Sequence, residues 1–247
     1  MQIAAKQVKK KIVILRHVKI SVIIPTYQEA ENISALIHFL QLHGNDGIAE
    51  IIVSDGGSTD DTIQVAGLAG AKTLSSPVKG RSGQMNYGVS FASGDILYFI
   101  HADTFPPTSF VNDIQRAVAD GYAFGRYRTK FNSRKWLLKL NAFFTRFDLF
   151  VCYGGDQTLF MTRELFEETG GFDTAMLIME DYDMVHRAKA RARYSILRKS
   201  ALVSARKYDT NSWWQVLKAN YTIIQLFKKG ASQQHMVDSY KRMLTYR

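Results

Sequence analysis

Cysteine and proline are scarce in this sequence of 247 residues. The single cysteine, Cys152, excludes an intramolecular disulfide framework and a cysteine-rich zinc site, which favours a reducing compartment such as the cytoplasm. With only 4 prolines, 46% hydrophobic residues and 12% aromatics, the chain can fill a core, which argues against disorder or a fibrous repeat. We therefore expect one α/β domain of ordinary size with additions to it.

Long apolar runs are also missing. No run approaches the roughly 18 to 20 residues that a membrane-spanning helix needs. The N-terminal stretch is basic, but it lacks the apolar core and the small-residue cleavage site of a secretion signal. We therefore expect a cytoplasmic protein, with peripheral contact to the inner face of a membrane as an open alternative. Residues 1–18 are expected to be a basic extension, and Val18 is an alternative start.

The net charge of +10 is distributed unevenly along the chain. Residues 1–19 hold 6 basic and no acidic side chains, residues 20–184 hold 12 basic and 20 acidic, and residues 185–247 hold 14 basic and 2 acidic. A basic tail on an acidic body indicates an anionic partner, such as nucleotide phosphates, anionic lipid or nucleic acid. A solvated basic helix face is an equally good interpretation.

Apolar periodicity predicts alternating strands and helices in the first half. Such β-α-β crossovers imply a Rossmann-like, mostly parallel central sheet flanked by helices. The second half is less regular. The predicted strands are 20–24, 48–54, around 73–74, 96–100, 123–131 and 194–197, and the predicted helices include 33–40, one from about 83, 133–147, 163–168, one from about 180, 212–228 and 232–246.

Three polar clusters, at 25–29, 55–60 and 101–103, each follow a predicted strand. Ligands of open α/β sheets bind at the carboxyl ends of the strands, so these clusters are expected to form one site. Asp55 could accept a hydrogen bond from a ligand, or it could simply hold a turn and helix cap. His101 and Asp103, on one face of a strand, could serve a divalent cation or precede a cap.

Two other groups of charged residues could take part in catalysis or in phosphate binding. Glu180, Asp181 and Asp183 follow an apolar run, and they are either helix N-terminal acids or carboxylates for a catalytic base. The segment 79–84 places cations and glycines before a helix, which suits a phosphate, and Arg206 adds positive charge from the basic tail. Neither the phosphate loop of ATPases nor the dinucleotide fingerprint is matched.

Taken in order, the segments 21–33 (SVIIPTYQEAENI), 53–62 (VSDGGSTDDT) and 101–104 (HADT) resemble the family 2 glycosyltransferases, which have the GT-A fold. The similarity continues through 80–81, 84–86, 154–157 (GGDQ), 170–173 (GGFD) and 179–181 (MED), and it covers roughly residues 19–210. The pattern is most similar to a small bacterial branch with HADT and GDQ motifs, some members of which are associated with arsenosugar biosynthesis genes.

The resemblance implies an inverting, hexosyltransferase-type enzyme that uses a nucleotide-diphosphate sugar, expected to be a UDP- or GDP-sugar, and a divalent metal, Mn²⁺ or Mg²⁺. Asp103 would hold the metal, with His101 at the first position of the family's D-x-D motif. Asp181 would be the catalytic base, and Glu180 would orient the acceptor or the base. The residues expected to bind the nucleotide are Pro25, Thr26, Tyr27, Glu29, Asp55, Arg81, Asn86, His101, Ala102 and Arg206.

The resemblance divides the chain into a nucleotide half (19–103), an acceptor half (104–210) and basic C-terminal helices (211–247) packed on the domain. The acceptor could be a small molecule, a glycan or a lipid carrier. Aromatic and basic residues alternate at helical spacing in 134–151. We expect this stretch to pack against the sheet or against a partner subunit in a homodimer, and a lipid-facing helix is the alternative.

Two other functions fit some of these features. A sugar nucleotidyltransferase shares the nucleotide-binding sheet, but it requires a glycine-rich, arginine-containing loop where this chain has 25–29. A nucleic-acid-binding module is suggested by the basic tail with Trp213, Trp214 and Tyr221, although aromatics at helical spacing are more often core. We therefore expect no specific nucleic-acid partner.

Overall fold

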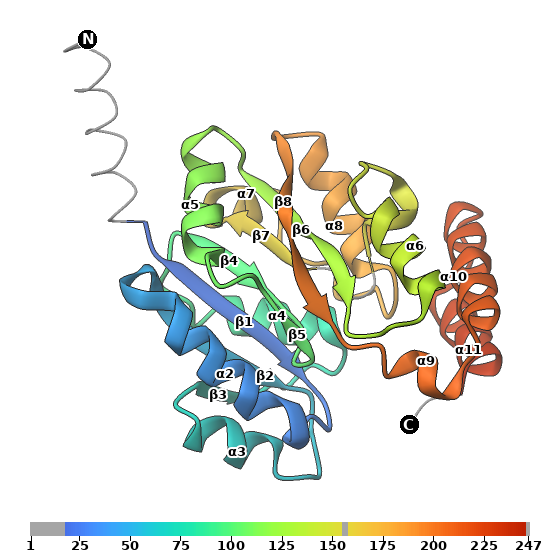
Figure 1. Cartoon of the computed structure of the whole chain (residues 1–247), viewed down its shortest axis with the longest axis horizontal. Helices are drawn as coiled ribbons and strands as arrows, with labels where there is room; N and C mark the ends of the chain where they lie inside the picture. The colour runs from blue at the N-terminus through green and yellow to red at the C-terminus, as the bar shows by residue number, and fades with distance from the viewer. Residues whose placement is uncertain (1–17, 155–157, 246–247) are drawn as a thin grey trace.

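The protein is described by a computed structural model that covers residues 18–154 and 158–245 (Figure 1). The predicted basic extension 1–18 lies outside the described residues except for Val18. Within the described part, a single sheet has the strand order β3-β2-β1-β4-β7-β6-β8-β5. The strands are β1 (Ile20–Thr26), β2 (Ile48–Asp55), β3 (Lys72–Ser75), β4 (Ile96–Phe99), β5 (Thr104–Phe105), β6 (Phe124–Phe131), β7 (Leu159–Thr162) and β8 (Tyr194–Val203).

Helices cover the sheet, and further helices lie beyond one end of it (Figure 1). They are α2 (Ala30–Gly44), α3 (Thr62–Leu68), α4 (Arg81–Val89), α5 (Phe110–Ala119), α6 (Trp136–Phe144), α7 (Arg163–Thr169), α8 (Glu180–Lys189), α9 (Lys207–Thr210), α10 (Trp213–Lys228) and α11 (Gln233–Met243), with 3-10 turns η1 (Asn45–Gly47) and η2 (Phe150–Cys152). No helix in the described ranges is long and apolar enough to cross a bilayer.

The first half of the sheet is parallel, as the crossovers predict. β1 pairs in parallel with β2 and β4, and β2 pairs in parallel with β3. Every residue of β1 is buried, which is typical of a strand covered by helices on both faces. The second half is mixed, because β7 runs antiparallel to both β4 and β6, whereas β6 and β8 are parallel.

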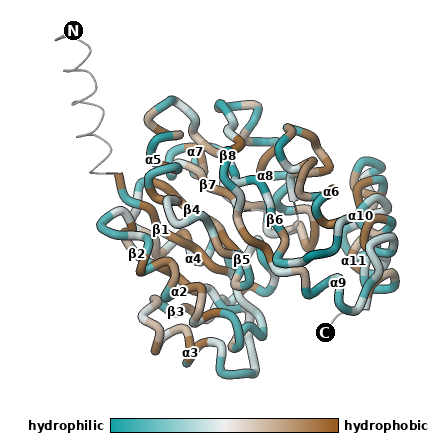
Figure 2. The backbone as a smooth tube through the Cα atoms, viewed as in Figure 1, coloured by the Kyte–Doolittle hydropathy of each residue, from teal (hydrophilic) through white to brown (hydrophobic). Residues whose placement is uncertain are grey.

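The core has one apolar cluster on each face of the sheet. Because side chains alternate along a strand, Val22 and Ile24 pack in the cluster under α2 and α5, whereas Ile23 packs in the cluster under α4, α7 and α8. Figure 2 shows the apolar colour along the central strands and the hydrophilic colour at many of the surrounding turns. This double-sided core holds β1, β2 and β4 rigidly, and the polar loops at their carboxyl ends are therefore held as well.

The C-terminal helices pack beside α6 and α8 rather than on the sheet. Leu138 of α6 packs with Val216 of α10 in one small cluster. A second cluster joins Met179 and Tyr182, at the start of α8, to α10 and α11. The predicted helix 133–147 is shorter in the structure, where α6 ends at Phe144 and the next residues form turns. The helices α10 and α11 thus form one wall of the region in front of α8.

Candidate functional site

The loops that follow β1 and β2 are joined by Asp55. Its carboxylate accepts hydrogen bonds from the Thr26 hydroxyl (3.0 Å) and from the backbone N–H groups of Gly57 (2.9 Å) and Ser58 (2.7 Å). Asp55 has no exposed surface. Gly57 has φ 94°, a conformation that glycine adopts without strain. The contacts of Asp55 are those of a carboxylate that holds a turn, which was the alternative to a ligand contact.

Two glutamines tie these loops to each other and to α4. Gln28, at φ 57°, donates from its side chain to the Thr59 hydroxyl (2.7 Å). Buried Gln84 of α4 donates to the carbonyl oxygens of Thr26 (2.6 Å) and Ser54 (2.9 Å). Gln84 belongs to the quoted family motif, but sequence reasoning assigned it no role. It fixes the start of α4, and therefore Arg81, against the carboxyl ends of β1 and β2.

Arg206 brings the third polar cluster to the first. Its guanidinium donates to Glu29 (3.0 Å) and forms an ion pair with Asp103, with 3.2 Å between Nε and Oδ2. Arg206 is half exposed, whereas the side chains of Glu29 and Asp103 are 13% and 19% exposed. Glu29 and Arg206 are 177 positions apart in the chain. Residues predicted separately as nucleotide ligands and as a metal ligand therefore form one charged cluster.

The exit of β4 differs from the prediction. β4 ends at Phe99, and the Thr104 N–H donates to the His101 carbonyl (3.1 Å), so His101 and Asp103 lie in a turn. The argument that they share one face of a strand was wrong, because the strand ends before them. Ala102 is 3% exposed and its side chain packs in the core. The side chain of Ala102 therefore points away from the predicted nucleotide site.

Asn86 has a structural role that the sequence did not reveal. Its amide donates to the Phe172 carbonyl (2.7 Å) and accepts from the Phe172 N–H (2.9 Å). Through these two bonds Asn86 holds the turn 171–172, and its contact with a nucleotide stays a prediction. Ser82 of the same helix donates to the Met176 carbonyl (3.1 Å). Through these bonds α4 positions the segment that leads into α8.

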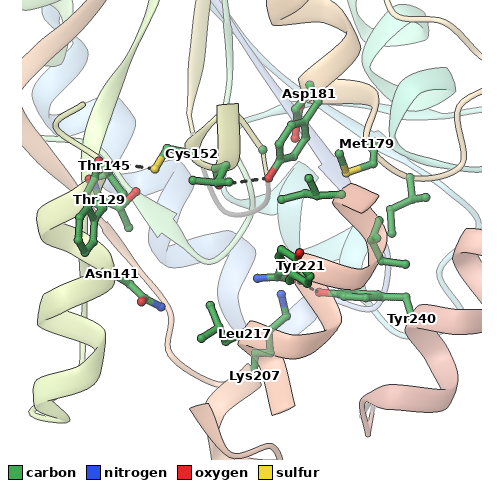
Figure 3. A pocket seen from close by; sticks show the side chains of 18 of the residues that line it. Thr129, Asn141, Thr145, Cys152, Met179, Asp181, Lys207, Leu217, Tyr221 and Tyr240 are labelled. Atoms are coloured by element: carbon green, nitrogen blue, oxygen red, sulfur yellow. Dashed lines mark hydrogen bonds between the residues drawn. The ribbon is translucent and has the colours of Figure 1, made fainter. Parts of the chain in front are cut away.

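A cavity of about 530 Å³ lies in front of the N-terminus of α8. In the view of Figure 3, Asp181 lies across this cavity from Lys207 and Leu217. Tyr182 also lines this cavity. Burial is the main reason that the pKa of its phenol is raised well above the usual value, so the side chain adds no charge to the cavity. The lining residues are Arg81, Thr129, Phe131, Asn141, Phe144, Thr145, Val151, Cys152, Gly154, Ile178, Met179, Glu180, Asp181, Tyr182, Lys207, Tyr208, Leu217, Asn220, Tyr221, Ile223, Ile224 and Tyr240.

Glu180 is the buried charge of this cavity. Its side chain is 2% exposed, and one oxygen lies 2.7 Å from Nε of Arg81. Within residues 18–154 and 158–245, neither carboxylate oxygen has a hydrogen-bond partner of good geometry. Met179, directly before it, is held at φ 70° although it is not glycine, and strained residues of this kind are enriched at functional sites. The carboxylate therefore retains acceptor capacity toward the cavity.

Other polar residues of the cavity were not singled out from the sequence. Asn141 accepts from the Trp213 ring N–H (3.2 Å), and Asn220 accepts from the Tyr240 hydroxyl (3.2 Å). Asn141 lies on α6 and Asn220 on α10, helices that converge only in the folded chain, and no local motif marks them. The motif residues 155–157 lie outside the described residues.

Residues 21–176 match the sequence profile of Glycosyl transferase family 2. An uncharacterised glycosyltransferase of Mycobacterium tuberculosis is 28% identical over 191 residues, which cover 68% of each chain. Among solved structures, the glucosyl-3-phosphoglycerate synthase of Mycobacterium tuberculosis, in complex with Mn²⁺, UDP-glucose and phosphoglyceric acid, superposes with TM-score 0.63, 20% identity and coverage of 87% of this chain and 81% of that one.

A second structural relative comes from another organism. The mannosyltransferase of Pyrobaculum calidifontis, in complex with GDP-mannose and Mn²⁺, superposes with TM-score 0.61 at 18% identity and covers 92% of this chain and 70% of that one. At these identities the likeness shows the fold, a mixed sheet flanked by helices of the GT-A type. The fold expected from the sequence is thereby confirmed.

Proposed function

Because the chain belongs to glycosyl transferase family 2 and is therefore a glycosyltransferase, we propose that it transfers a sugar from a nucleotide-diphosphate donor to a hydroxyl acceptor with inversion. The donor is proposed to be a UDP- or GDP-sugar, since the two solved relatives described above hold UDP-glucose and GDP-mannose. The donor would occupy the loops after β1, β2 and β4, and the acceptor would occupy the cavity in front of α8.

The observation that carries this proposal is the pair of carboxylates at the start of α8. Asp181 lines the cavity, and Glu180 is buried beside it with acceptor capacity to spare. Arg81, the ion-pair partner of Glu180, begins the helix that Gln84 fixes to the loops of β1 and β2. The Arg81–Glu180 ion pair therefore connects the start of α8, where the acceptor would bind, to the loops where the donor would bind.

The proposed reaction is a single displacement. Asp181 accepts the proton of the acceptor hydroxyl, whose oxygen attacks the anomeric carbon of the sugar. The bond from this carbon to the diphosphate oxygen breaks, and the nucleoside diphosphate leaves with the electron pair. Glu180 orients the acceptor or Asp181 from its position beside Arg81. On the donor side, Tyr27 is 61% exposed next to Thr26 and can cover the nucleoside.

A divalent metal, Mn²⁺ or Mg²⁺, would need ligands from the bound diphosphate as well as from the protein. Within the described ranges, no group of three or more His, Cys, Asp or Glu side chains could hold a metal by itself. Small divalent cations are commonly held by one or two carboxylates together with substrate phosphates, so Asp103 with a diphosphate is a suitable donor set. A metal bound there would supply charge that stabilises the leaving diphosphate.

The decisive experiment compares transfer with nucleotide binding in Asp181→Asn. The variant keeps the shape of the side chain but removes the base, so transfer should fall by about 10²-fold to 10⁴-fold. Calorimetric titration of UDP and GDP, with and without Mn²⁺, should show affinity close to that of the wild type. Asp103→Ala is the matched control, which should lose metal-dependent nucleotide binding. Full residual turnover in Asp181→Asn would remove Asp181 from the base role.

A further inference from the structure

One surface of the protein exposes large apolar side chains. The stretch 134–151 was expected to pack against the sheet or a partner, yet Leu138 is the buried residue of α6. Ten large apolar side chains of α6, of the turns after it and of α10 are between 41% and 69% exposed. We name this surface the apolar rim. It consists of Trp136, Leu140, Phe143, Phe144, Phe147, Leu149, Val151, Trp214, Leu217 and Tyr221.

Part of the apolar rim lies at the mouth of the cavity. Phe144, Val151, Leu217 and Tyr221 line the cavity and are also more than 40% exposed, so they lie where it meets solvent. The two sides of the rim are held together, because the Trp213 ring N–H of α10 donates to Asn141 of α6. In Figure 1, α6 and α10 lie together at one end of the molecule, away from α2 and α3.

The charges around the apolar rim are mainly positive, and Asp148, which lies within it, is paired with Lys189. The segments 131–147 and 210–231 contain no Asp or Glu. Arg134, Lys139, Arg146 and Lys218 are exposed on them. The guanidinium of Arg146 lies 3.9 Å from the centre of the Phe143 ring, so a cation and an exposed aromatic share one site. Aromatic and aliphatic side chains with interspersed cations are the composition of surfaces that bind anionic lipid.

We propose that the apolar rim docks the protein on the surface of an anionic lipid bilayer. The helix α6 has 9 residues, so it would lie in the interface rather than cross the bilayer. A second copy is a poorer occupant, since a twofold contact would set the same basic surface against itself. Docking places the cavity mouth against the bilayer, and this consequence for the acceptor rests on the proposed function.

The test is flotation of the full chain with anionic vesicles, which are phosphatidylcholine with about one-third phosphatidylglycerol. Vesicles of pure phosphatidylcholine are the uncharged comparison. The wild type should float with the anionic vesicles. In Trp136→Ser/Phe147→Ser the partition coefficient should fall by about ten-fold or more, because two apolar contacts are removed. Lys139→Glu/Arg146→Glu should also lose binding to the anionic vesicles, since the charge of the rim is reversed.

Leu42→Ser/Leu68→Ser is the matched control, because these leucines are 74% and 82% exposed on α2 and α3. It should bind vesicles as the wild type does. Equal loss of vesicle binding in this control would overturn the proposal. So would a wild type that remains in the bottom fraction with anionic vesicles, whether it is then found as a dimer or bound to oligonucleotides through the rim. UDP and GDP titrations should be unchanged in every variant, which separates failure of docking from failure of the proposed transferase.

Discussion

Arg81 is the residue at which the two parts of the site meet. The sequence predicts it as a nucleotide ligand, and the structure pairs it with buried Glu180. Its side chain is 41% exposed, so one side of the guanidinium remains accessible to solvent. A single cation can therefore offset the charge of a buried carboxylate and still face the donor loops. Whether it contacts a nucleotide remains a prediction.

The Arg81–Glu180 pair leads to a stability prediction. Arg81→Met should lower the free energy of unfolding by about 1–3 kcal/mol, because a buried carboxylate loses its partner. A fully buried pair would lose more, but Arg81 is partly exposed. Adding Glu180→Gln should recover most of the loss, since no charge is then left unpaired. Urea unfolding of both single variants and the double variant measures this coupling, and additive losses would show that the two residues act independently.

Arg206 leads to a prediction about cation binding. Its guanidinium lies beside Asp103 and opposes any cation at that carboxylate. Arg206→Met should therefore bind Mn²⁺ more tightly without nucleotide, by several-fold, but should bind the nucleoside diphosphate about ten-fold more weakly, because one charged hydrogen bond is lost. Exposed Arg198→Met is the control. Calorimetry that finds both affinities unchanged in Arg206→Met would remove Arg206 from the site.

At the scale of elements, α6 is also fixed at its C-terminal end by a buried cation. Arg126 of β6 is 1% exposed and donates to the carbonyl oxygens of Thr145 (2.7 Å) and Phe147 (3.2 Å). A cation is favourable at this end of a helix, where carbonyl groups lack partners. The helix can therefore keep its apolar side chains exposed and still hold its place in the acceptor half.

An ion pair also connects the segment after α6 to α8. Asp148 and Lys189 approach to 2.5 Å. Burial alone would raise the pKa of Asp148, but hydrogen bonds from Lys189 and Tyr153, with the charges of Lys189 and Arg126, lower it below its ordinary value of 3.8. The contribution of Asp148 to stability is therefore present above about pH 4 and is lost as the pH falls through the lowered pKa.

We therefore expect Asp148→Asn to be less stable than the wild type at pH 7 by about 0.5–1 kcal/mol, a small value because both side chains are partly exposed. The difference should shrink between pH 7 and about pH 2, because the carboxyl group of the wild type gains its proton as the pH falls through the lowered pKa. Urea unfolding at both pH values measures it, with exposed Asp238→Asn as the control. A difference that is independent of pH would show that the ion pair contributes nothing.

At the scale of the whole molecule, the two ends of the sheet differ in how they are covered. The strands β1, β2 and β4 lie between two large apolar clusters, whereas α6, α10 and α11 are held by two small ones. The loops after β1, β2 and β4 therefore stand on a rigid base, and the walls of the cavity in front of α8 rest on fewer buried contacts. This difference suits the role proposed for the cavity, in which the acceptor would enter between helices.

Hydrogen exchange should reveal this difference. Amides of β1 and β4 are expected to exchange only on global unfolding, whereas those of α6 should exchange through local opening at a free energy lower by about 2 kcal/mol or more. The measurement is native-state exchange in low concentrations of denaturant. Equal protection of α6 and β1 would contradict this expectation and would show that the molecule opens as a single unit.

The apolar runs of β1, β2 and β4 and their polar ends were readable from the sequence, because strand burial and turn chemistry are local properties. The same reasoning failed at β7, whose four residues carry no periodic pattern. Nor did it reveal that Ala102 packs in the core or that Asn86 holds a distant turn. Motif order predicted that these segments share a site, but it did not reveal which side chains hold the scaffold.

The sequence by itself determined the family, the α/β class and the positions of the charged clusters, since these depend on residue type and spacing along the chain. Only the tertiary structure decided that Arg206 joins Glu29 to Asp103, that Arg81 meets Glu180, and that α6 and α10 expose their apolar faces around one cavity. Those outcomes depend on packing between segments far apart in the chain, and the energies of such contacts leave no periodic trace in the sequence.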